Sequence, residues 1–218
     1  MYECVIFDVD GTLIDTEEGI LASLQRVVKE ELKQYIDLDK LRFALGITGA
    51  AALSKLGIKN IAKANKNWIK YGEDYSHLVK VYDGIERNLI RLKGAGIYTG
   101  IVTSRTLVEL ENDFFPFGLQ KYMRAITSAD DTEKHKPEPE PLLEFLEISK
   151  VSPSSTLYIG DTIYDMKCAN SAGIDFALAL WGAKSSNGIT DAKYVLKVRM
   201  KSGMLSKIKA ADEPPVLY

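Results

Sequence analysis

A short apolar run, Cys4–Phe7, leads directly into two carboxylates, Asp8 and Asp10, and then into a glycine. The run lacks the polar alternation of a half-exposed strand, so it predicts a strand inside a parallel sheet that is covered on both faces. Ligands of open α/β sheets bind at the carboxyl ends of such strands. We therefore expect Asp8 and Asp10 to lie at a ligand site.

From Asp15 onward the apolar residues follow a helical period. The apolar positions that share one face are Ile20, Leu21, Leu24, Val27, Val28 and Leu32. Asp15 and Glu18 have a spacing like that of a capping box at the start of a helix. This pattern predicts a long amphipathic helix shortly after the paired carboxylates.

Residues 37–80 contain short apolar clusters that are broken by glycines, and they show no convincing strand. This pattern predicts a compact helical insert. We therefore expect an all-α cap domain at residues 16–80 and a core domain made of residues 1–15 and 81–218.

After Gly84 the pattern of predicted strands and helices alternates. The expected elements are helix 85–93, strand 97–102, a helix near 106–115, strand 125–127, helix 142–149, strand 157–159, a helix near 163–172, strands 176–180 and 194–198, and helix 200–210. Such β-α repetition is typical of an α/β fold with a doubly wound, mainly parallel sheet.

Composition and charge fit a globular chain. It has 218 residues, of which 46% are hydrophobic, and its formal net charge is −2. The chain as a whole therefore lacks the positive charge that binds nucleic acid or an anionic membrane. Segment 63–70 is basic and contains Trp68, but such a run is usually the solvated face of a helix. We expect no nucleic-acid or membrane partner.

The two cysteines, Cys4 and Cys168, form neither a disulfide framework nor a zinc site with paired spacing, so we expect two buried thiols. The N-terminal apolar run has no basic segment before it, and no stretch approaches the roughly 18 apolar residues of a membrane helix. These features favour a cytoplasmic location.

The segment DVDGTL at residues 8–13 resembles motif I of the haloacid dehalogenase superfamily, in its phosphatase branch. Carboxylates near a glycine also occur in calcium loops. The EF-hand pattern requires glycine at its sixth position and an acid at its twelfth, whereas Gly11 is fourth counting from Asp8 and the twelfth residue is Gly19. The calcium-loop alternative therefore fails on spacing.

Thr103 and Ser104 follow predicted strand 97–102 and resemble motif II of the same family. Hydroxyl and amide donors at this edge of the sheet could hold a phosphoryl oxygen, which needs several oriented donors. The alternative is an ordinary helix N-cap.

Lys136 begins the segment KPEPEP, in which alternate prolines forbid a helix and favour an extended rod. The segment resembles motif III, whose lysine neutralises the phosphoryl group and the nucleophile. The alternative is a stiff loop with an exposed lysine. We expect Lys134 and His135 to be solvated, although His135 could reach a substrate.

Asp161 follows predicted strand 157–159, and Asp165 comes one helical turn later, so both carboxylates would point toward one locus. The GDxxxD pattern resembles motif IV. Clustered acids repel one another, and a hard divalent cation such as Mg²⁺ is a natural reason to gather them. Helix N-termini also favour acids, but that alternative does not explain why three separate strands end in residues of this kind.

The resemblance covers residues 4–16 and 83–182, and it implies a Rossmann-like core with an inserted helical cap. It implies that Asp8 attacks a phosphomonoester to form an aspartyl-phosphate, and that Asp10 acts as the acid and then the base. The implied phosphate-binding residues are Thr103, Ser104 and Lys136. The implied Mg²⁺ ligands are Asp8, the backbone carbonyl of Asp10, and Asp161, with Asp165 bound directly or through water.

Dehalogenase members lack an aspartate at the position of Asp10, so its presence favours phosphoryl transfer. A helical cap after motif I resembles that of phosphoglycolate phosphatases, pyrophosphatases and β-phosphoglucomutases, and such a lid favours small substrates. Ser104 and Arg105 replace the Asn-Lys pair of glycolate-type enzymes, which weakens that assignment. The cap residues that could contact a leaving group are Arg42, Thr48, Lys70, Tyr71 and Tyr75.

Three functions stay open at this point. The first is a Mg²⁺-dependent phosphatase that acts as a monomer on small phosphomonoesters of the phosphoglycolate type or a related type, and a pyrophosphatase is an alternative to it. The second is a phosphomutase that uses the same aspartyl-phosphate. The third, a non-catalytic sensor, is disfavoured because the acids and Lys136 are all retained.

Overall fold

The computed structural model describes residues 2–183 and 188–197. Its core is a six-stranded sheet with the order β5-β4-β1-β6-β7-β8, and every neighbouring pair in this sheet is parallel. The strands are β1 (Cys4–Phe7), β4 (Tyr98–Val102), β5 (Ala125–Thr127), β6 (Thr156–Gly160), β7 (Asp175–Ala179) and β8 (Tyr194–Leu196). β1 is fully buried at the centre of the sheet, so the prediction of a doubly wound α/β core is confirmed.

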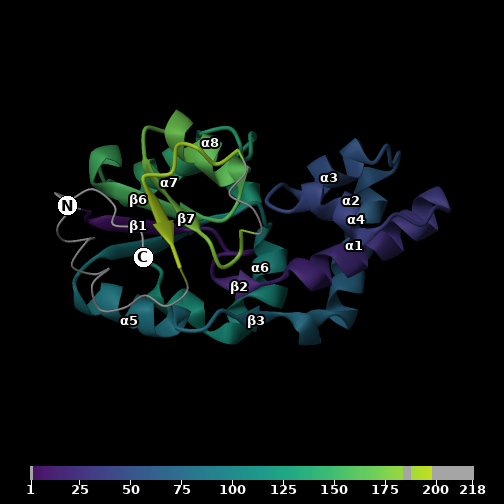
Figure 1. The fold of residues 1–218 in the computed structure, drawn as a ribbon, viewed down its shortest axis with the longest axis horizontal. Coiled ribbons are helices and arrows are strands. Elements are labelled where there is room, and N and C mark those ends of the chain that lie inside the picture. The colour runs from purple at the N-terminus through teal and green to yellow at the C-terminus, as the bar shows by residue number, and fades with distance from the viewer. Residues whose placement is uncertain (1, 184–187, 198–218) are drawn as a thin grey trace.

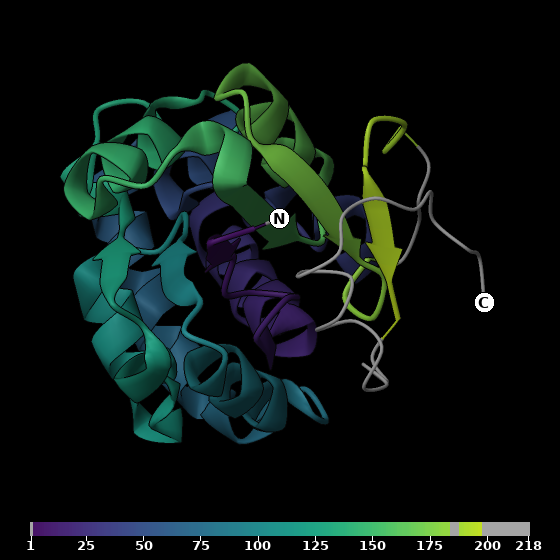
Figure 2. The same cartoon turned by 90° about the vertical axis from the view of Figure 1, so that its left-hand side faces the viewer.

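Helices cover both faces of this sheet (Figure 2). They are α5 (Ile85–Gly94), α6 (Leu107–Asp113), α7 (Glu140–Ser149) and α8 (Ile163–Ser171). Apolar residues of α5 and α6 share one buried cluster with one face of β1, while those of α7 and α8 share a second cluster with its other face. Cys4 and Cys168 both lie in the second cluster as buried thiols without a disulfide, as the sequence predicts.

A helical lobe, which we call the cap, lies beside the carboxyl-terminal edge of the sheet (Figure 1). Its α-helices are α1 (Glu17–Leu32), α2 (Leu38–Leu41), α3 (Gly49–Lys55) and α4 (Ile61–Asp74), with short 3₁₀ turns at Arg42–Ala44 and Ser76–Leu78. The cap has its own buried cluster, in which Leu24 and Val28 of α1 pack with Leu41 and Leu53. Trp68 is partly buried against this cluster and donates a hydrogen bond to Ser23. The cap boundaries at residues 16 and 80 stay a prediction.

A small antiparallel ribbon joins the cap to the core. Its strands are β2 (Ile14–Asp15) and β3 (Lys80–Val81). The expectation of no strand up to residue 80 is therefore wrong at its end, because two-residue strands are too short to show alternation. The capping-box expectation is also wrong, since Asp15 belongs to β2 and the N-cap of α1 is Thr16, whose side chain makes no capping hydrogen bond.

The remaining predicted elements up to residue 197 agree with the structure to within a few residues, while residue 198 of the last expected strand lies outside the described residues. The helix expected at 200–210 lies outside the described residues. Among the described residues, no helix is long and apolar enough to span a membrane.

Candidate active site

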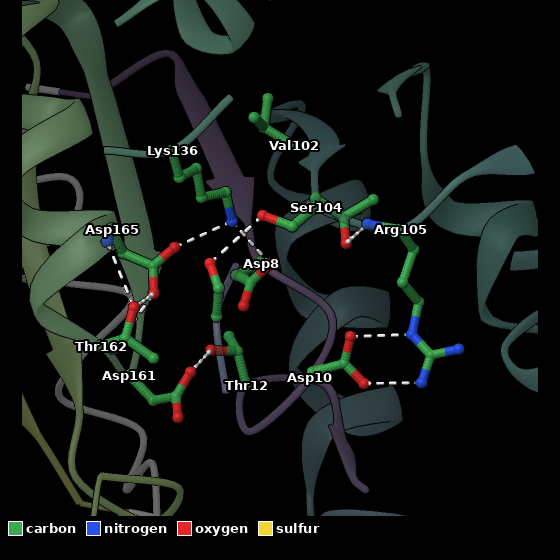
Figure 3. A network of polar contacts seen from close by, with 12 residues as sticks. Asp8, Asp10, Thr12, Val102, Ser104, Arg105, Lys136, Asp161, Thr162 and Asp165 are labelled. Atoms are coloured by element: carbon green, nitrogen blue, oxygen red, sulfur yellow. Dashed lines mark hydrogen bonds and ion pairs between the residues drawn. The ribbon is translucent and has the colours of Figure 1, made fainter. Parts of the chain in front are cut away.

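Three adjacent strands deliver polar residues to one edge of the sheet. Phe7 of β1 lies opposite Ile101 of β4 and Ile159 of β6, so the residues that follow these strands meet at their carboxyl ends. Asp8 continues this arrangement by donating its backbone N–H to the Ile159 carbonyl at 2.9 Å. Asp8 and Asp161 therefore lie at one locus (Figure 3). Thr103 directly follows β4, which is paired with β1, at the same edge of the sheet.

Lys136 is the cation of this locus. Its Nζ donates to Asp8 Oδ1 at 2.7 Å and to Asp165 Oδ1 at 2.8 Å, and its side chain is 1% exposed. The alternative of an exposed lysine on a stiff loop is therefore excluded. Burial would lower the pKa of Lys136, but Asp165 and Asp8 outweigh it and hold that pKa above its ordinary value, so the ammonium keeps its charge.

Asp8 lies in an unfavourable electrostatic setting. Burial, followed by the nearby charges of Asp165 and Asp10, raises the pKa of Asp8 to about 7, against the lowering effect of Lys136. Two buried carboxylates that share one ammonium still repel each other. A further cation at this locus would relieve that repulsion.

Both carboxylate oxygens of Asp165 accept hydrogen bonds. Its Oδ1 accepts hydrogen bonds from Lys136 and from the Tyr158 hydroxyl, the latter at 2.9 Å, and its Oδ2 accepts from the backbone N–H and the hydroxyl of Thr162. The Thr162 contacts form a capping box at the start of α8. Gly160 is needed here, because a Cβ at this position would lie 2.5 Å from Asp165 Cγ. The Asp165 carboxylate is thus fully engaged.

Asp161 completes a cluster of acids. One oxygen each of Asp8, Asp161 and Asp165 lie within 4.8 Å of one another. Burial raises the pKa of Asp161 well above its ordinary value, and Asp165 and Asp8 add to this. The hydrogen bond that Asp161 accepts from the Thr12 hydroxyl is long, at 3.4 Å. A hard divalent cation fits this donor set, because it binds carboxylate oxygens and offsets their charge.

Gly11 leaves room for the Asp161 carboxylate. Its φ of +72° lies in the left-handed region that favours glycine, and a Cβ there would lie 2.2 Å from Asp161 Oδ2. Motif I therefore needs glycine at this position for two separate physical reasons.

Asp10 faces away from the acid cluster and forms a two-bond ion pair with Arg105. Arg105 Nε lies 2.7 Å from Asp10 Oδ2, and Nη2 lies 2.8 Å from Oδ1 (Figure 3). Thr16 also donates to Oδ1 at 2.6 Å. Burial would raise the pKa of Asp10, but Arg105 and Thr16 outweigh it and lower that pKa. Sequence reasoning missed this role of Arg105, because the pair joins residues 95 positions apart.

The two motif II residues make different contacts. Thr103 is buried, and its hydroxyl accepts from the Arg105 backbone N–H at 3.2 Å, which leaves its own proton for an acceptor. Ser104 instead donates to the Gly46 carbonyl of the cap at 3.2 Å. The structure therefore places Ser104 at the contact between core and cap.

A pocket lies between core and cap next to these residues. Asp8, Asp10 and Arg105 line it from the core, and Trp68 and Ile69 line it from the cap.

The five cap residues that the sequence analysis named as possible contacts of a leaving group do not line this pocket. Arg42 is paired with Glu17 through two hydrogen bonds, and Tyr71 donates to Glu30. Thr48 caps α3. The adjacent loop differs in part from expectation: Lys134 is exposed, whereas His135 is half-buried.

A parallel α/β sheet that gathers acids and a buried lysine beneath a helical cap defines a class of α/β enzyme. The sequence model of the haloacid dehalogenase-like hydrolase family matches residues 5–179. The chain therefore belongs to this family of hydrolases, and the resemblance seen in the sequence is confirmed.

Individual relatives agree with this assignment. The chain is 31% identical over 210 residues, 96% of both chains, to a protein of Caldanaerobacter subterraneus subsp. tengcongensis described as a proposed pyrophosphatase PpaX. It is 30% identical over 182 residues to the pyrophosphatase PpaX of Bacillus cereus, covering 83% of this chain and 84% of that protein. A crystal structure of a proposed phosphoglycolate phosphatase from Lactobacillus plantarum superposes with a TM-score of 0.84 at 26% identity, covering 95% of this chain and 99% of that one.

Proposed function

We propose that this hydrolase is a Mg²⁺-dependent phosphatase that cleaves small phosphorylated substrates through an aspartyl-phosphate on Asp8. The observation that carries the proposal is the buried Asp8 carboxylate, held at 2.7 Å by Lys136 beside the Asp161 acid and open to the pocket under the cap. A carboxylate in this position can serve as a nucleophile, while the ammonium offsets the charge of the transferring group.

In the first step an Asp8 oxygen attacks phosphorus and the bond from phosphorus to the leaving oxygen breaks. Asp10 gives its proton to that oxygen. Lys136 and the Thr103 hydroxyl bind the oxygens of the transferring phosphoryl group, where negative charge redistributes in the transition state. The products of this step are the leaving group and phosphorylated Asp8.

In the second step water attacks the phosphorus of phosphorylated Asp8. The Asp10 carboxylate takes a proton from this water, and the bond from phosphorus to the Asp8 oxygen breaks. Inorganic phosphate leaves, Asp8 returns to its carboxylate form, and Asp10 is protonated for the next cycle. Closure of the cap over the pocket would keep bulk water out of the first step.

The residues that would hold Mg²⁺ are Asp8, Asp161 and the backbone carbonyl of Asp10. Asp165 would act through water or by fixing Lys136, because its two oxygens already accept four hydrogen bonds. When bound, Mg²⁺ offsets the negative charge of carboxylates and phosphoryl oxygens.

The proposed substrate is a small phosphate ester or diphosphate, such as 2-phosphoglycolate or pyrophosphate. The names of the relatives support both candidates. The proposal includes a monomeric enzyme in the cytoplasm without a nucleic-acid or membrane partner, which the net charge of −2 supports. A phosphomutase of the β-phosphoglucomutase kind is the second candidate, because it would use the same Asp8 chemistry.

The test is phosphate release from a panel that contains pyrophosphate, 2-phosphoglycolate and sugar phosphates, with Mg²⁺ or with EDTA. We expect release that needs Mg²⁺ and is abolished in Asp8→Asn. Asp39→Asn, a change at an exposed cap residue, is the matched control and should keep full activity. Isomerisation of a sugar phosphate without free phosphate would select the mutase, and phosphate binding without turnover of any compound would contradict both.

A further inference from the structure

Arg105 is a buried guanidinium with a two-sided environment. On one side its Nε and Nη2 atoms hold the Asp10 carboxylate, and on the other its Nη1 atom donates to Asp113 at the end of α6 and to the Glu109 carbonyl. Its side chain is only 11% exposed. Asp113 can therefore keep the guanidinium in place while the contact with Asp10 changes.

The contact between Arg105 and Asp10 lies on the wall of the pocket. Both residues, together with Asp8 and Asp113, line the space under the cap. In the proposed mechanism Asp10 protonates the leaving oxygen, so the leaving group must sit beside the Asp10 carboxylate. Since the Arg105 nitrogens are within 2.8 Å of that carboxylate, the atoms bonded to the leaving oxygen come close to the guanidinium.

The observed arrangement of Asp10 is incompatible with proton donation. Both of its oxygens accept hydrogen bonds from Arg105, and Oδ1 also accepts from Thr16. A guanidinium and a hydroxyl that donate to a carboxylate leave it no proton to give. The Arg105 contact must open at least in part before the first step, and its Nε–Nη2 edge then needs another partner, because a buried charge without one is costly.

We propose that the Nε–Nη2 edge of Arg105 moves from Asp10 to an anionic group of the leaving group. The proposed partner is a group with two oxygens, either a carboxylate or a second phosphate, which matches the planar fork of a guanidinium. This inference rests on the proposed function and makes Arg105 its specificity-determining residue. Substrates whose leaving group is anionic give this edge of Arg105 a new partner and so release Asp10, whereas esters of neutral alcohols must open the ion pair without a replacement partner and react more slowly.

The kinetic test compares pyrophosphate, 2-phosphoglycolate and ethyl phosphate in saturating Mg²⁺. The first two carry a second phosphate and a carboxylate, and the third has a neutral leaving group. We expect Arg105→Gln to lower kcat/KM by about 10- to 100-fold for the anionic leaving groups and much less for ethyl phosphate. The substrate whose kcat/KM falls further in Arg105→Gln, pyrophosphate or 2-phosphoglycolate, shows whether Arg105 prefers a second phosphate or a carboxylate.

Two further variants separate the role of Arg105 from effects on folding and from the loss of any surface arginine. Arg105→Lys retains the charge but cannot form two parallel bonds, so we expect it to keep part of the selectivity and to fold even where Arg105→Gln is unstable. Arg26→Gln is the matched control, because Arg26 also pairs with two carboxylates, Asp74 and Glu30, but on the exposed surface of the cap. Its kcat/KM values should equal those of the wild type.

A binding experiment tests, independently of turnover, whether Arg105 binds the second anion of a ligand. Titration calorimetry with Mg²⁺ present compares 3-phosphonopropionate and methylenediphosphonate, which carry a second anion, with propylphosphonate, which does not. We expect about 10- to 100-fold tighter binding of the first two by the wild type, and equal binding of all three by Arg105→Gln. Equal affinities in the wild type, or an equal loss for every ligand in Arg105→Gln, would overturn the role of Arg105 without affecting the proposed phosphatase activity.

Discussion

Lys136 Nζ lies 2.7 Å from Asp8 Oδ1, although 128 positions separate the two residues in the sequence. Both side chains are nearly inaccessible to solvent, at 1% and 4% exposure. A buried ion pair of this kind does not by itself stabilise a fold, but removing one partner leaves a buried charge without compensation. The pair is therefore a sensitive point of both the fold and the site.

Lys136→Met should strongly destabilise the protein. The change leaves Asp8 and Asp165 without their shared cation, which costs about 3–5 kcal/mol in free energy of unfolding. For a chain of this size that corresponds to a loss of roughly 6–20 °C in Tm. Thermal unfolding in EDTA measures the effect without interference from metal binding.

The control is Lys193→Met. Lys193 also lies 2.7 Å from an aspartate, Asp175, but its side chain is 49% exposed. An exposed pair contributes about 0–1 kcal/mol. If both variants lost the same Tm, the buried setting of Lys136 would not be the cause.

Asp10→Asn should trap the phosphorylated enzyme. Without the carboxylate, water is not activated in the second step, while a substrate with a good leaving group can still phosphorylate Asp8. We expect kcat to fall by about 10²- to 10⁴-fold. Intact-mass spectrometry after mixing with acetyl phosphate should show one added phosphoryl group, which is absent from the double variant with Asp8→Asn.

Much of this site follows from the sequence, and the reason is local. Asp8, Thr103 and Asp161 each follow directly on a buried strand, so a parallel sheet is enough to bring them together. The pairing of Arg105 with Asp10 does not follow, because nothing in a stretch of sequence tells which distant carboxylate a guanidinium will meet. The capping-box expectation at Asp15 was wrong for a related reason. Asp15 pairs with Lys80 of β3 in an antiparallel ribbon, and β3 is distant from it in the sequence.

Stability in EDTA should fall with rising pH because of Asp8. The folded protein raises the pKa of Asp8 to about 7 from its ordinary value of 3.8, through burial first and the nearby acids second. The stabilising contribution of the protonated form is therefore fully present below about pH 4 and is lost as pH rises through about 7. Asp8→Asn lacks this titration.

Urea unfolding at about pH 5 and about pH 8 measures this effect. We expect the wild type to lose at least about 1 kcal/mol more than Asp8→Asn between the two pH values. Asp39→Asn, which changes an exposed residue, should behave as the wild type does. A parallel pH dependence of the wild type and Asp8→Asn would show that Asp8 is ionised in the folded protein throughout.

Gly11→Ala should impair both the fold and the binding of Mg²⁺. The new Cβ would lie 2.2 Å from Asp161 Oδ2, so the carboxylate must leave its place in the acid cluster. Gly96→Ala is the matched control, because Gly96 has a similar φ of +76°, but a Cβ there would meet no atom of the described residues within 4 Å.

Both variants carry the left-handed backbone cost of about 1–2 kcal/mol, and only Gly11→Ala displaces an acid of the cluster. We therefore expect both variants to lose Tm through backbone strain, with an additional loss in Gly11→Ala. Calorimetry should show a Mg²⁺ affinity that falls at least about tenfold in Gly11→Ala and stays at the wild-type value in Gly96→Ala. Wild-type Mg²⁺ affinity in Gly11→Ala would mean that Asp161 does not hold the cation.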